Sequence, residues 1–237
     1  MRNPVSERGR GPETGLLAEF VGTCHRWGEQ GDRLLLARNR YNTVNPSTCT
    51  AQMDDELTTL AFSDYLELEK TSPVRHDYIA GQLFEIETLS PQHDRLAINI
   101  GSGLYDRLRD TNCQVFTAEM KLWIPSLDVA YYPDVMVVCD PEDRNPNYKT
   151  QPRLIVEILS SNTQGTDRQE KFFAYQTLPS FQEYVLVPQD QTGIERYRKT
   201  AAGDWEKTLF NPKQDLHLQS LGLTLSLSEI YEDSLME

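Results

Sequence analysis

The chain has little material for covalent or zinc-based cross-links. Four of its 237 residues are cysteines, no two of them form a C-x-x-C pair, and no histidine stands at zinc-finger spacing from them. Cysteines in a reducing compartment are usually free thiols. We therefore expect no structural zinc site and four reduced, mostly structural thiols. The four are Cys24, Cys49, Cys113 and Cys139.

Long apolar runs are also absent from the sequence. A membrane-spanning helix needs about 20 predominantly apolar residues, and no stretch approaches that length. The opening residues, MRNPVSERGRGPETG, lack the apolar segment of a secretory signal. We therefore expect a cytoplasmic protein with no membrane partner.

Basic residues are in deficit. The sequence has 23 Lys and Arg against 36 Asp and Glu, which gives a net charge of −13. Proteins that bind nucleic acid by broad phosphate neutralisation carry the opposite balance. This composition excludes that class of binding, so any nucleic-acid contact is expected to be local or bridged by a metal ion.

The first 52 residues differ in composition from the rest. They carry seven Arg, no Lys and five acidic residues, whereas residues 53–237 carry sixteen basic and thirty-one acidic residues. Their one apolar cluster, Leu34–Leu36, is too small to form a core. We predict a flexible or weakly ordered extension over 1–52, with too little charge to favour a basic nucleic-acid arm. Residues 53–237 form the predicted folded domain, which is long enough to bury a sizeable core.

Hydrophobic periodicity in the second part predicts a mixture of helices and strands. Helices are expected at 62–70, for about five turns after Ser90–Pro91, from Asp167 to Leu178 and near 227–231. Strands are expected at 76–79 and 82–86 around an Ala80–Gly81 turn, in the alternating stretch 115–124, and at 135–138, 154–159, 184–187 and 194–198. Such a mixture around one sheet indicates an α/β or α+β fold.

Two carboxylates stand where the sequence is otherwise apolar. Glu157 interrupts the run 154–159, and Asp134 directly precedes the run 135–138. Burying an unpaired charge is unfavourable, and two acids on adjacent strands would repel each other. A divalent metal ion or a lysine is the natural partner, and Lys171 lies one turn into the helix expected to open at Asp167.

An ordered set of motifs around these residues resembles the Uma2 (DUF820) family of the PD-(D/E)xK nuclease superfamily. The match extends from about residue 62 to residue 198. Its motifs are Tyr78-Ile79-Ala80-Gly81, Ser90-Pro91-Gln92-His93, Tyr132-Pro133-Asp134-Val135, Val156-Glu157-Ile158-Leu159-Ser160, Asp167 with Lys171 and Tyr175, Leu178-Pro179-Ser180, and Glu183-Tyr184.

The resemblance implies a restriction-endonuclease-like core, in which a mixed central β-sheet is flanked by helices. It also implies a Mg²⁺-dependent endonuclease that hydrolyses phosphodiester bonds of DNA, with Mn²⁺ as an alternative ion. Asp134 and Glu157 carry over as metal ligands. The superfamily lysine is missing two positions after Glu157, where Leu159 stands, so the resemblance implies Lys171 on the next helix as its replacement.

Other residues and roles stay open at this stage. His93, Glu85 and Asp167 are accessory candidates for the catalytic site, with Glu87 as a further acid; Asp167 more simply caps a helix, and His93 more simply has a structural role. Tyr175 is expected in the core. Asp134 could equally cap backbone amides, Glu157 could pair structurally with a buried cation, and Lys171 could be solvated.

The function also has alternatives. The main one is a catalytically silent binding or interaction module that keeps the nuclease fold, and another is a phosphodiesterase acting on RNA or a small molecule. The sequence does not determine the oligomeric state and leaves a homodimer open.

Overall fold

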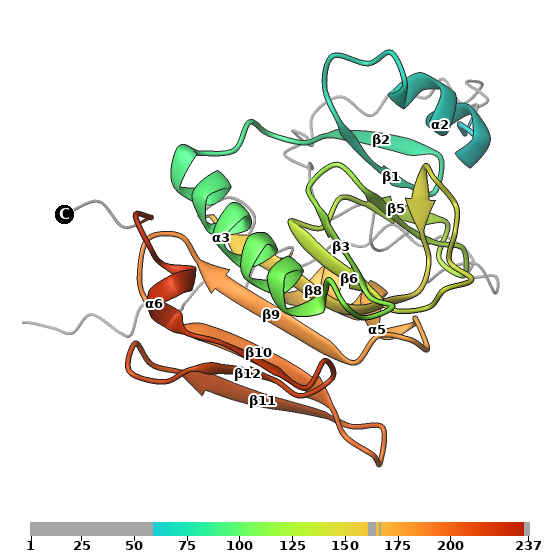
Figure 1. Cartoon of the computed structure of the whole chain (residues 1–237). Coiled ribbons are helices and arrows are strands. Elements are labelled where there is room, and N and C mark those ends of the chain that lie inside the picture. Colours follow the sequence, from blue (N-terminus) through green and yellow to red (C-terminus); the bar gives the residue numbers. More distant parts are fainter. Residues whose placement is uncertain (1–58, 161–164, 166, 235–237) are drawn as a thin grey trace, which may run out of the picture.

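The structure, a computed structural model, describes residues 59–160, 165 and 167–234. Its central feature is a six-stranded mixed sheet (Figure 1). Across this sheet the strands are β11 (Trp205–Phe210), β10 (Ile194–Lys199), β9 (Glu183–Pro188), β8 (Pro152–Leu159), β6 (Val135–Val138) and β3 (Gln114–Thr117). Strands β8 and β9 are parallel and the other neighbours are antiparallel. The α/β class with a mixed central sheet is therefore confirmed.

A second sheet of five strands lies beside the first. Its order is β2 (Gln82–Glu85), β1 (His76–Ile79), β5 (Val129–Tyr131), β4 (Lys121–Ile124) and β7 (Tyr148–Lys149). A separate hairpin joins β12 (Leu216–Leu218) to β13 (Leu223–Leu225). The sequence pattern predicted one sheet, so the division into several is a correction.

The two faces of the central sheet bury different clusters. Because side chains alternate along a strand, Leu154, Val156 and Ile158 of β8 face one cluster, and Ile155 and Leu159 face the other. The first cluster includes α3 (Pro91–Leu108) and α6 (Leu227–Ile230), and α3 crosses that face in Figure 1. The second includes α5 (Phe172–Gln176) and strands of the five-stranded sheet. Residues 154–159 of β8 are thus buried whichever way they point.

Several predicted elements are confirmed. Helix α2 covers Phe62–Glu69, and α3 begins after Ser90, whose hydroxyl accepts a hydrogen bond from the His93 amide. The β1–β2 turn uses Ala80 and Gly81, both with positive φ. A Cβ on Gly81 would approach Thr59 Cβ to 2.6 Å, so both backbone conformation and close packing require glycine there.

The alternating stretch 115–124 is not one straight strand. It bends at Ala118–Met120, so that β3 belongs to the central sheet and β4 to the second sheet. Its antiparallel partner bends as well: β5 leads through residues 132–134 into β6. Five positions separate Thr117 from Leu122, but four separate their partners Val135 and Tyr131. One extra residue, as in a β-bulge, therefore accompanies the corner, a feature that often lies next to active sites.

The helix predicted from Asp167 consists of two helix types. It begins as a π-helix, η1 (Asp167–Lys171), and continues as α5. Strands β11, β12 and β13 were not predicted, although leucines alternate with His217 in β12 and with Thr224 in β13. The predicted extension over residues 1–52 lies outside the described residues.

Among the helices of the described part, none has the length and apolar character needed to span a membrane.

The expectation of four reduced thiols is wrong for two of them. Cys113 and Cys139 form a disulfide. Gln114 pairs with Val138 at the end of the β3–β6 ladder, which brings the next residue on each strand face to face. Strand register creates this proximity, and a separation of 26 residues in sequence does not reveal it. Cys24 and Cys49 lie outside the described residues.

Reduction of this disulfide is expected to lower the free energy of unfolding by about 3 kcal/mol, because the bridge closes a loop of 26 residues in the unfolded chain. Urea unfolding with and without dithiothreitol measures the difference. In a Cys113→Ser, Cys139→Ser variant, dithiothreitol should no longer shift the midpoint. Four titratable thiols in the folded, untreated protein would contradict the bridge.

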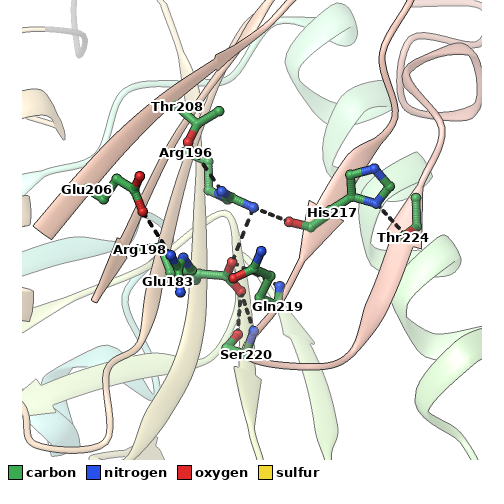
Figure 2. A network of polar contacts seen from close by, with 9 residues as sticks. All are labelled: Glu183, Arg196, Arg198, Glu206, Thr208, His217, Gln219, Ser220 and Thr224. Atoms are coloured by element: carbon green, nitrogen blue, oxygen red, sulfur yellow. Dashed lines mark hydrogen bonds and ion pairs between the residues drawn. The ribbon is translucent and has the colours of Figure 1, made fainter. Parts of the chain in front are cut away.

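A buried polar network fixes the β12–β13 hairpin to the central sheet (Figure 2). The Glu183 carboxylate on β9 is fully buried and accepts hydrogen bonds from the backbone amides of Gln219 and Ser220 and from the Ser220 hydroxyl. Arg196 on β10 lies 3.8 Å from Glu183 and donates to the His217 carbonyl. The pair satisfies backbone groups of the 217–220 region that would otherwise lack partners.

Candidate active site

The two carboxylates singled out in the sequence lie on adjacent central strands. Val135 of β6 pairs with Val156 of β8. One step further along this antiparallel register, Asp134 stands opposite Glu157. Side chains at opposite positions of such a pair lie on the same face of the sheet. The strand pairing therefore brings the two acids together at the start of β6, beside the corner at 132–134.

Glu157 is only 1% exposed, and both of its carboxylate oxygens have partners. Lys171 Nζ lies 3.1 Å from Oε2, and the Tyr175 hydroxyl donates to Oε1 at 2.7 Å. Lys171 and Tyr175 are four residues apart, at the end of η1 and within α5, so they lie on the same side of the helix. One helix thus supplies both the counter-charge and a neutral hydrogen-bond donor to the buried carboxylate.

The Tyr175 hydroxyl is held in its protonated form. Burial raises the pKa of this group well above its usual value, and the adjacent Glu157 carboxylate raises it further. The Tyr131 ring packs edge-on against the Tyr175 ring, which fixes its orientation. Tyr175 was expected simply in the core; it is buried, but it is also a direct partner of Glu157. The four-residue spacing from Lys171 was the signal for this.

Asp134 is held by groups from two elements. Its Oδ2 accepts a hydrogen bond from the Ile158 amide at 2.7 Å and lies 3.2 Å from His93 Nε2. The amide belongs to the residue after Glu157, so it fixes Asp134 relative to β8. Within the described residues, Asp134 Oδ1 makes no hydrogen bond. One oxygen of the carboxylate is therefore anchored and the other is available to a ligand.

His93 meets Asp134 from the first turn of α3. Its side chain is almost completely buried, and its Nδ1 has no hydrogen-bond partner in the described part of the chain. The carboxylate at Nε2 favours the tautomer that carries its proton on Nε2. The Ser90 hydroxyl, which caps α3, also donates to the Gln189 side chain at the end of β9. This cap fixes the start of the helix and hence the approach of His93.

The remaining candidates are placed differently. Glu85 is exposed on β2, an edge strand of the second sheet, and Glu87 follows that strand. The structure does not bring Glu85 to Asp134 or Glu157. Asp167 begins η1, but its side chain lies outside the described part, so its predicted capping role stays a prediction. Leu159, at the position of the superfamily lysine, is buried in the cluster that contains Tyr175.

The side chains at this centre fit a hard divalent cation. They offer two carboxylates, one of which has an unengaged oxygen, and Mg²⁺ is commonly held by one or two carboxylates together with water and substrate phosphate. Across residues 59–160, 165 and 167–234, no group of three or more His, Cys, Asp or Glu is arranged to hold a metal ion. Water and substrate phosphate commonly complete the coordination of an ion held by one or two carboxylates.

Comparison with known proteins adds three findings. The family Uma2, described as "Putative restriction endonuclease", matches residues 62–228. Two proteins of Synechocystis sp. are similar along most of their length: slr1290 is 31% identical over 173 residues, covering 73% of this chain and 91% of that protein, and sll1609 is 33% identical over 149 residues, covering 62% and 84%. Both are described as uncharacterized.

A solved structure shares the fold. The crystal structure of a "putative nuclease belonging to DUF820" from Anabaena variabilis superimposes with a TM-score of 0.56 at 18% sequence identity. The superposition covers 70% of this chain and 96% of that one. This chain and the Anabaena variabilis protein therefore have the same fold.

Proposed function

This chain belongs to the Uma2 family, and we propose that it is a metal-dependent endonuclease that hydrolyses phosphodiester bonds of DNA. The family and the structural neighbour both support a nuclease-like function. We propose Mg²⁺ as the ion and DNA as the substrate. One observation carries it: Asp134 and Glu157 stand opposite each other in the strand register, with Lys171 3.1 Å from Glu157.

Each residue has a specific task in this proposal. Asp134 and Glu157 would hold Mg²⁺, with Mn²⁺ as the alternative. A bound ion of this type polarises the phosphate and lowers the pKa of water. Lys171 orients the attacking water and offsets negative charge that develops on the phosphate oxygens. His93 and the Ile158 amide hold Asp134 Oδ2, and Oδ1, which makes no hydrogen bond within the described residues, would bind the ion.

The acidic composition is consistent with this assignment. A net charge of −13 gives the protein no general attraction for the DNA backbone. Contact with a phosphate then depends on local cations and on an ion that bridges carboxylate and phosphate.

Supercoiled plasmid incubated with purified protein and Mg²⁺, Mn²⁺ or EDTA tests the function. We expect nicked or linear product with either metal and none with EDTA; intact plasmid under all conditions would argue against the proposal.

Lys171→Met is expected to reduce plasmid cleavage about a hundredfold, because the change keeps most of the side-chain length and removes the charge. Metal binding should persist, since neither carboxylate is altered. Initial cleavage rates and Mn²⁺ titration calorimetry separate the two effects. Lys199→Met is the matched control, because Lys199 lies at the end of β10 and its side chain contacts none of the site residues. Equal cleavage by the two variants would exclude Lys171 as the displaced lysine.

A catalytically silent nuclease-fold binding module is the second candidate. It is favoured by the contacts of Glu157, whose two oxygens are already engaged by Lys171 and Tyr175. In that case the protein binds metal through Asp134 without cleaving DNA. Mn²⁺ binding that disappears in Asp134→Ala, with no nuclease activity in the unaltered protein, would support this candidate over the first.

A further inference from the structure

A polar cleft of about 490 Å³ opens next to the candidate active site. Asp134, Glu157 and Lys171 do not line this cleft, but two of its lining residues are close in sequence to residues of the site. Tyr132 lies two positions before Asp134, and Asp94 follows His93 on α3. The cleft therefore begins at the corner where the chain passes from β5 into β6, and it extends along the β2–α3 connection and the end of α2.

Two cations face one aromatic ring in this cleft. Lys121 Nζ lies 4.9 Å from the centre of the Tyr132 ring, and the Arg75 guanidinium lies 5.9 Å from it. The Tyr132 hydroxyl donates to the buried Glu69 carboxylate, which also binds His76. The hydrogen bond to Glu69 fixes the ring, and both cations lie close to it.

Lys121 makes no direct ion pair within the described residues. No acidic oxygen of these residues lies within 4.0 Å of its ammonium group, which contacts the Tyr132 ring, and the Glu69 and Glu119 carboxylates act on it from further away. The side chain is half-buried, and this burial lowers the pKa of the ammonium group, although the two carboxylates partly offset the effect. A partly desolvated cation without a counter-ion in direct contact is unfavourable, so binding an anion in the cleft relieves that penalty.

The carboxylates of the cleft restrict which anion fits. Glu69 is buried behind Tyr132, and Glu119 lies 3.3 Å from Arg75. Glu87 and Asp94 also line the cleft. Four acids against two bases disfavour a free anion of high charge density, but they accept hydrogen bonds from the amino groups of bases. The combination matches a polynucleotide strand, which presents single phosphate charges beside hydrogen-bond donors.

We propose that this cleft binds the nucleic-acid strand beside the scissile phosphate, with Lys121 and Arg75 contacting a backbone phosphate. The proposal rests on the proposed nuclease function, since it assigns the path of that substrate. Lys121 is the principal contact, because Arg75 also donates to the Ala118 carbonyl and pairs with Glu119. Neither residue touches Asp134 or Glu157, so they act on binding and not on the chemical step.

Binding of a fluorescent DNA duplex of about 20 base pairs, measured by anisotropy in EDTA, tests the proposal without cleavage. Lys121→Gln is expected to weaken binding about 3- to 10-fold and to reduce the slope of log K against log salt by about one, as for one lost phosphate contact. Lys121→Arg should restore most of the affinity. Lys207→Gln is the control, because Lys207 also lies over a tyrosine ring, Tyr197 at 5.3 Å, but on β11 of the central sheet, whereas Lys121 is on β4 of the second sheet.

The possible results distinguish a failure of the cleft proposal from a failure of the proposed nuclease function. If the unaltered protein binds the duplex and Lys121→Gln binds equally well with the same salt slope, the cleft is not the strand path, and the nuclease assignment stands. If the unaltered protein binds no DNA at all, the proposed substrate fails and the cleft proposal fails with it. Thermal unfolding of each variant verifies the fold. In cleavage assays, Lys121→Gln should raise KM with little change in kcat.

Discussion

Asp134→Asn and Glu157→Gln are each expected to slow metal-dependent plasmid cleavage about a hundredfold or more. Each substitution removes one charged oxygen ligand and keeps the shape of the side chain. An electrostatic interaction made in a buried site at the reacting phosphate has effects of this size. Cleavage rates with Mg²⁺ and Mn²⁺, together with circular dichroism of the variants, measure the change. Full activity in either folded variant would remove that residue from the site.

The two variants should differ in stability. Asn at 134 can still accept the hydrogen bond from the Ile158 amide, so Asp134→Asn is expected to leave the free energy of unfolding nearly unchanged. Glu157→Gln removes the carboxylate that lies 3.1 Å from Lys171 Nζ, and the Lys171 side chain is only 12% exposed. Breaking one side of a buried ion pair is strongly destabilising, so this variant should unfold at a lower urea concentration. Activity in both should nevertheless be lost.

Glu183→Ala is expected to lower the free energy of unfolding by about 3–5 kcal/mol, the range for breaking a buried ion pair. Glu183 is fully buried and accepts three hydrogen bonds from Gln219 and Ser220, and its loss leaves Arg196 without a carboxylate. Urea unfolding followed by tryptophan fluorescence measures the change.

Glu206→Ala is the matched control for this prediction. Glu206 pairs with Arg198 at 2.8 Å in the same region (Figure 2), but its side chain is 57% exposed. An exposed ion pair contributes about 0–1 kcal/mol, so the control should unfold almost as the unaltered protein does. If the two variants lose the same stability, burial of Glu183 is not what makes the network important.

The residues at the centre of the candidate site could be recognised from the sequence. Glu157 in an apolar run and Asp134 before another were both placed on central strands, because isolated acids in such runs need a partner. The helix that carries Lys171 was also expected after β8. Their adjacency is confirmed by the register, while their catalytic roles stay predictions.

Other features depend on information that periodicity lacks. Alternation over 115–124 describes a strand, but it does not show that the strand changes sheets at Ala118–Met120. The Cys113–Cys139 bridge follows from a register that no local pattern encodes. The contact of His93 with Asp134 depends on how α3 crosses the sheet, which is a tertiary property. In each case, periodicity does not show which segments distant in sequence pair or pack together.

The position of Lys171 on a helix affects the cooperativity of local unfolding around the site. Strand pairing alone brings Asp134 and Glu157 together, whereas Lys171 and Tyr175 reach Glu157 only when η1 and α5 dock on the sheet. A state with the sheet formed and this helix undocked would contain two adjacent carboxylates without the Lys171 ammonium group and the Tyr175 hydroxyl, and like charges repel each other. That partly open state is therefore raised in free energy. The helix and the two central strands are thereby coupled into one unit that opens and closes together.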